Sequence, residues 1–102
     1  MDECEQVRND MATAVRDIAA LEQEILTLTP RVPTATLEAL QQGLRSVRNM
    51  ADDAEPWVAY CGICGYSSYP AARGLVDDMT AAVAQLRATV ASAGADARHP
   101  QR

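Results

Sequence analysis

Three cysteines are the residues of this 102-residue chain that are best suited to chemistry. Cys61 and Cys64 are separated by two residues and followed by Gly65, while Cys4 lies near the start of the sequence. Two thiolates at this spacing can ligate one metal ion, and the glycine allows a backbone turn that points amides at the sulfurs. The pattern therefore predicts a metal site, with zinc as the expected ion.

The sequence around this pair, Cys-Gly-Ile-Cys-Gly-Tyr-Ser-Ser-Tyr-Pro at 61–70, resembles one half of a rubredoxin or zinc-ribbon site. The resemblance covers about ten residues and matches only Cys61 and Cys64. Those families need a second Cys-x-x-Cys, which this chain lacks, and the surrounding sequence is helical. A structural zinc ion takes four ligands. We expect Cys4 as the third ligand, and an acidic residue beside Cys4 or a second subunit as the source of the fourth.

A first helix over residues 2–29 is predicted to position Cys4. Its apolar residues alternate at spacings of three and four, which is the heptad pattern of a coiled coil. They are Cys4, Val7, Met11, Ala14, Ile18, Leu21, Ile25 and Leu28. Isoleucine at a positions and leucine at d positions favour parallel two-stranded pairing. We expect these residues, apart from Cys4 and Ala14, to form a homodimeric self-association seam; packing within the chain's own bundle is the alternative.

A second helix over 34–60 is predicted to return the chain to the cysteine end. Pro30 and Pro33 break the first helix and form a tight connection. Apolar residues then continue at the same spacing: Leu37, Leu40, Leu44, Val47, Ala51, Ala54 and Val58. Pro56 should kink this helix or end it near Glu55. A third helix is expected over 70–93, with Gly94 as its stop and 94–102 as a disordered tail.

These elements predict an all-α fold, an antiparallel helical hairpin plus a third helix, in one domain over residues 1–93. The hairpin brings Cys4 to the same pole as Cys61 and Cys64. Every aromatic residue of the chain falls at this pole: Trp57, Tyr60, Tyr66 and Tyr69. We expect these aromatics to bind a protein partner, with core packing as the alternative.

Other roles for the cysteines remain open at this point. Cys4 and Cys61 fall on apolar seams and suit plain buried thiols. A disulfide from Cys4 to Cys61 or Cys64 would close the open end of the hairpin, although such bonds are uncommon in the cytosol. Redox catalysis is disfavoured, because the motif follows a helix, and a helix C-terminus disfavours a thiolate.

Charge and composition narrow the class of function. Nine basic residues and 14 acidic ones give a net charge of −5, which argues against nucleic acid and against an anionic membrane surface. No apolar run is long enough to cross a bilayer. The N-terminal residues are acidic, unlike a secretory signal, so we expect a cytoplasmic protein.

The sequence therefore favours a small non-enzymatic interaction or regulatory module, stabilised by cysteine-bound zinc. The alternative is a thiol redox switch or metal sensor that uses Cys4, Cys61 and Cys64. The chain contains no phosphate-binding loop, and its one histidine, His99, lies on the expected tail. The negative net charge also suggests a third function, an acidic mimic of DNA that blocks a nucleic-acid-binding protein. The high alanine and arginine content suggests a GC-rich bacterial or phage genome.

Overall fold

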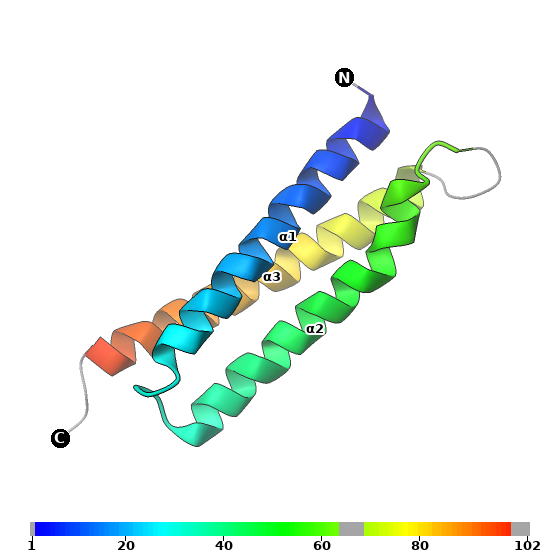
Figure 1. The fold of residues 1–102 in the computed structure, drawn as a ribbon. Helices are drawn as coiled ribbons and strands as arrows, with labels where there is room; N and C mark the ends of the chain where they lie inside the picture. Colours follow the sequence, from blue (N-terminus) through cyan, green and yellow to red (C-terminus); the bar gives the residue numbers. More distant parts are fainter. Residues whose placement is uncertain (1, 64–68, 99–102) are drawn as a thin grey trace.

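Three long helices make up the fold. The computed structural model describes residues 2–63 and 69–98, in which the helices are α1 (Glu3–Leu28), α2 (Thr34–Ala59) and α3 (Tyr69–Arg98). Figure 1 shows α2 running back along α1, and α3 returning in the direction of α1. Each helix packs against the other two. The predicted all-α three-helix bundle is confirmed.

The ends of α1 and α2 follow from local sequence. The carboxylate of Asp2 caps α1 by accepting a hydrogen bond from the Cys4 amide (3.3 Å), and two acidic residues lie in the first turn. At the other end, the Arg31 amide donates to the Leu28 carbonyl (2.8 Å) in the turn between the helices. Pro33 precedes α2 and its carbonyl accepts from the Leu37 amide (3.0 Å), so the connection is as short as predicted.

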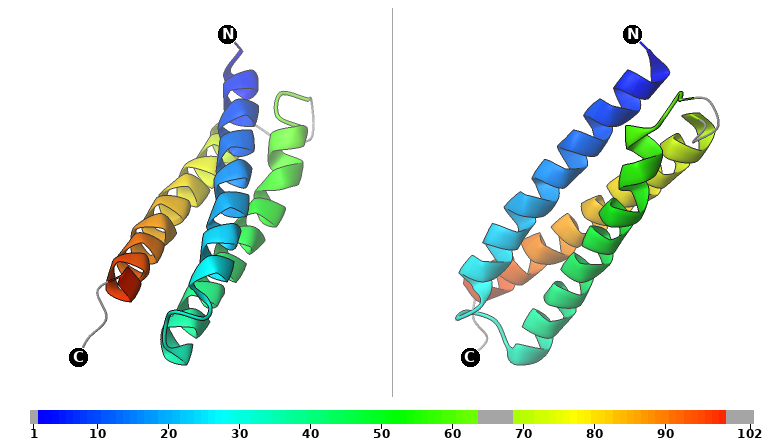
Figure 2. Two further views of the ribbon diagram at one scale, coloured as in Figure 1. Left: turned by 60° about the vertical axis from the view of Figure 1, so that its left-hand side comes forward. Right: turned by 45° about the vertical axis from the view of Figure 1, so that its right-hand side comes forward.

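Pro56 lies inside α2 without ending it. The helix continues to Ala59, and the Tyr60 amide donates to the Pro56 carbonyl (3.0 Å). A proline removes one backbone donor and crowds the preceding turn, so a bend is the expected result. Figure 1 and the right view of Figure 2 show the ribbon of α2 changing direction over its last turns.

The third helix is longer than the sequence predicted. It continues through Gly94 to Arg98, so the expected stop at Gly94 and the expected tail over 94–98 are wrong. A glycine that ends a helix usually adopts a positive φ, but among the described residues Gly62 alone does so. Gly94 is instead buried near Leu28, and Ala97 packs on the core. Residues 99–102, including His99, lie outside the described residues.

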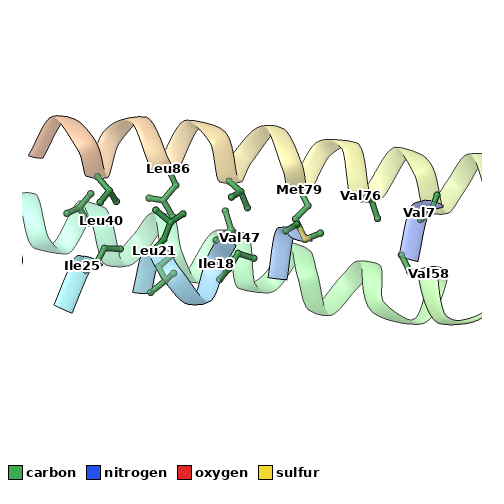
Figure 3. Close-up of a cluster of buried hydrophobic side chains, with 14 of the residues drawn as sticks. Val7, Ile18, Leu21, Ile25, Leu40, Val47, Val58, Val76, Met79 and Leu86 are labelled. Atoms are coloured by element: carbon green, nitrogen blue, oxygen red, sulfur yellow. The ribbon is translucent and has the colours of Figure 1, made fainter. Parts of the chain in front are cut away.

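The core runs the full length of the bundle and contains the predicted α1 seam (Figure 3). Five of the six residues expected in a homodimer interface are buried within the chain itself, and Met11 packs at the edge of its core. Figure 3 shows Val7, Ile18, Leu21 and Ile25 of α1 among apolar side chains of α2 and α3. The seam therefore packs inside the chain's own bundle, which corrects the expectation that it is available to a second copy.

Two helical glycines test how closely α2 and α3 pack. A Cβ at Gly43 would lie 2.8 Å from Cδ1 of Leu86, whereas a Cβ at the exposed Gly74 would meet nothing within 4 Å. Gly74→Ala should therefore stabilise the fold by about 1 kcal/mol, the difference in helix propensity. The midpoint of thermal unfolding should rise by about 4–8 °C.

Gly43→Ala should stabilise the fold less than Gly74→Ala does, because the Leu86 side chain must move to make room for the methyl group. Thermal unfolding of both variants, followed by circular dichroism, compares the two positions directly. Equal gains at Gly43 and Gly74 would contradict the close approach of Leu86 to α2.

Candidate functional site

Cys4 and Cys61 meet at one pole of the bundle and form a disulfide. Cys4 lies in the first turn of α1, and Cys61 follows the end of α2. The two residues are 57 positions apart in sequence, yet their Cα atoms are 5.7 Å apart. The predicted convergence of these two cysteines is confirmed. Cys64 lies outside the described residues.

Local contacts hold the disulfide in place. Both cysteines are buried, and the guanidinium Nη2 of Arg8 donates to the Cys61 carbonyl (3.1 Å), which ties α1 to the end of α2. The Cys61 amide donates to the Val58 carbonyl (3.2 Å). Gly62 has a φ of +83°, and a Cβ there would lie 3.3 Å from the Cys4 sulfur. Glycine thus supplies both the left-handed turn and the space beside the sulfur.

The disulfide bears on the predicted zinc site. Zinc binds thiolates, and sulfurs that are bonded to each other are not thiolates. Among residues 2–63 and 69–98, no group of three or more histidine, cysteine or acidic side chains is placed to hold a metal ion. In this arrangement Cys4 and Cys61 do not supply zinc with thiolate ligands. Binding by Cys4, Cys61 and Cys64 in the reduced protein stays a prediction.

Large apolar side chains are exposed beside the disulfide. We call Trp57, Tyr60 and Ile63 the aromatic patch; their exposed fractions are 42%, 45% and 47%. Trp57 and Tyr60 are one helical turn apart, and the Ile63 amide donates to the Tyr60 carbonyl (3.0 Å). Of the other predicted aromatics, Tyr69 is half-buried against the core, and Tyr66 lies outside the described residues.

Ile63 was missed by the sequence analysis. The signal was present, because an isoleucine that follows a glycine in a turn has few core neighbours to pack against. The structure thus leaves two of the four predicted residues, Trp57 and Tyr60, exposed at the end of α2, with Ile63 exposed just beyond them in sequence.

Ion pairs fasten α1 to α3 farther along the bundle. Arg73 lies between Asp10 and Asp77, at 2.8 Å from each carboxylate, and Asp17 pairs with Arg87 at 2.8 Å. Burial acts to lower the pKa of Arg73, but the hydrogen bonds and charges of the two carboxylates outweigh it and raise that pKa. Arg73 therefore stays charged near neutral pH and acts as a fixed cation that joins α1 to α3.

Comparison of the chain with protein-family models, curated proteins and solved structures found no match. Within the described residues, no helix combines the length and the apolar character that crossing a membrane requires. A functional proposal therefore depends on the geometry of the cysteine pole and of the surface around it.

Proposed function

We propose that the chain is a small non-enzymatic protein-interaction module that binds its partner through the aromatic patch. The observation that carries this proposal is the exposure of Trp57, Tyr60 and Ile63 together at one end of α2. Aromatic side chains combine a large apolar area with few rotatable bonds, and tryptophan and tyrosine are enriched among residues that dominate binding energy.

The disulfide supports this proposal because it orders the segment that carries the patch. Tyr60 and Ile63 flank Cys61, which is bonded to Cys4 of α1 and hydrogen-bonded to Arg8. A surface that is already ordered loses less conformational entropy when it binds. The patch is thus better prepared for binding than the same residues in a free loop.

The partner that fits this surface is a protein with an apolar pocket and a neutral or basic rim. The pocket would receive Trp57 or Tyr60, which are the largest side chains of the patch. The net charge of −5 disfavours an acidic partner, and exposed acids of α2, such as Asp53, lie near the patch in sequence.

Alanine substitutions test the patch. Trp57→Ala and Tyr60→Ala should each weaken partner binding at least tenfold, since truncating a central aromatic anchor typically costs about 2 kcal/mol or more. The tagged chain is used to capture partners from a lysate of its source organism. Quantitative mass spectrometry compares the amounts of each protein that the unchanged chain and the variants capture. Titration calorimetry then measures the affinity of each captured protein for the chain.

Gln41→Ala is the control, because Gln41 is an exposed residue of α2 near the end opposite the pole. It should retain full binding, and circular dichroism should show all three variants folded. Capture of the same proteins in the same amounts by Trp57→Ala, Tyr60→Ala and the unchanged chain would refute the proposal.

A thiol-based redox switch is the second candidate, and the Cys4–Cys61 bond is the observation that favours it. In a reducing compartment such as the cytosol, disulfides are usually transient and regulatory. Reduction should weaken binding in either case, because the bond orders the patch, so the reduction potential of the bond separates the two functions. A switch forms and breaks the Cys4–Cys61 bond within the range of cytosolic glutathione potentials, whereas a permanent structural bond stays formed throughout that range.

A further inference from the structure

A second exposed apolar surface lies on α1, away from the aromatic patch. Val15 and Leu26 are 46% and 59% exposed, and Ala12 and Ala19 are exposed as well. At about 3.6 residues per turn, these four positions fall on one strip of the helix, beside the core-facing side. We call Ala12, Val15, Ala19 and Leu26 the α1 strip. Leu26 is the most exposed large apolar residue among those described.

A groove runs between the α1 strip and α2. Its volume is about 750 Å³, and it is lined by Val15 and Ala19 on one side and by Ala51, Asp52 and Glu55 on the other. The apolar wall thus belongs to α1, whereas most of the α2 wall is charged. An exposed apolar surface with a charged rim is typical of a protein–protein contact.

We propose that the α1 strip binds a second copy of this chain, with the two α1 helices antiparallel and crossing at Ala19. A two-fold axis there places residues equally far before and after Ala19 opposite each other. Ala12 then faces the partner's Leu26, so a small side chain meets a large one. The two copies of Ala19 meet at the centre, where their small side chains allow the helices to approach closely.

Charge complementarity selects this arrangement. Arg16 and Glu22 both line the groove and are equally far from Ala19, so Arg16 of each copy faces the partner's Glu22. Glu22 already pairs with Arg48 across the groove, while among the described residues Arg16 has no ion pair. The antiparallel contact gives Arg16 a partner and extends the Glu22–Arg48 pair.

Two other arrangements of the dimer are unfavourable. If each α1 lay over the partner's α2, Val15 would face the charged side chains that line that wall, including the partner's Asp52 and the partner's Glu55. If the two α1 helices were parallel, Arg16 would face the partner's Arg16. Both alternatives place like charges together or set Val15 against carboxylates, whereas the antiparallel contact sets Val15 opposite the uncharged side chain of the partner's Gln23.

Ala19→Glu tests the position of the contact. It places two carboxylates at the crossing point and should weaken the dimer at least tenfold, as measured by sedimentation velocity over a wide range of protein concentration. Ala20→Glu is the matched control, because Ala20 is an exposed neighbour on the same helix that lies outside the α1 strip. It makes the same chemical change and should leave the dimer intact.

A charge exchange tests the orientation. Arg16→Glu alone and Glu22→Arg alone each produce like-charge contacts in an antiparallel homodimer, so each variant should be monomeric. An equimolar mixture of the two restores opposite charges at both contacts and should form a heterodimer. Val15→Asp should also abolish association.

Three outcomes would overturn the proposal. The first is an unchanged chain that remains monomeric at every concentration. The second is a dimer that tolerates Ala19→Glu, which would place the contact elsewhere. The third is a capture experiment in which the Val15→Asp variant no longer binds a different protein but still binds a second copy of the chain. The proposal is independent of the aromatic patch, because Trp57→Ala should not alter the dimer.

Discussion

Replacing Cys4 by serine is expected to lower the midpoint of thermal unfolding by about 15–30 °C. The disulfide joins residues that are 57 positions apart, so it restricts a large loop of the unfolded chain. For a loop of this size the loss of chain entropy amounts to about 4 kcal/mol. That is a large share of the stability of a small domain, which is typically about 5–15 kcal/mol.

Thermal unfolding of the unchanged chain with and without reductant separates the contribution of the bond to stability from the effect of replacing a side chain. Reduction breaks the bond but leaves both sulfurs in place. Cys61→Ser should match Cys4→Ser, since either substitution removes the same bond. Cys64→Ser is the control and should keep the higher midpoint. A shift of only a few degrees in Cys4→Ser and in the reduced chain would show that the bond contributes little to stability.

Leu21→Ala is expected to destabilise the fold by about 2–5 kcal/mol. Leu21 is 2% exposed and lies where all three helices meet (Figure 3), so its removal forfeits apolar burial and leaves a cavity. Rigid neighbours on α2 and α3 limit how far the site can collapse. The expected loss in the free energy of unfolding is therefore larger than most single substitutions cause.

Leu26→Ala makes the same change on the same helix at a residue that is 59% exposed. It should cost less than about 0.5 kcal/mol, provided that unfolding is measured at a concentration low enough to keep the chain monomeric. Urea unfolding gives both free energies. Equal costs for Leu21→Ala and Leu26→Ala would mean that α1 is not oriented as described.

The sequence predicted the helices and their order because apolar spacing and prolines encode them locally. The alternation of three and four gave the buried faces, and Pro30 and Pro33 gave the reversal between α1 and α2. The end of α3 was missed because Gly94 has two uses. It favours a stop when judged by its backbone freedom, yet here it allows close packing beside Leu28.

The candidate site was predicted only in part, for a related reason. Helix length placed Cys4 beside Cys61, but metal binding, burial and bonding all require the two cysteines to lie close together, so spacing in the sequence could not choose among them. The heptad pattern was equally ambiguous, because a dimer and a monomeric bundle bury the same seam. Exposure of Val15 and Leu26 could be read only once the packing of α1 was known.

The bond between Cys4 and Cys61 also governs how the molecule would respond to mechanical force. It closes α1, the connection and α2 into a covalent ring, from which only the residues outside 4–61 project. Tension applied to the two termini passes through the sulfurs and bypasses the ring. Pulling would peel α3 away and lengthen the tether by at most roughly 150 Å. With the ring cut by reduction, the whole chain would extend.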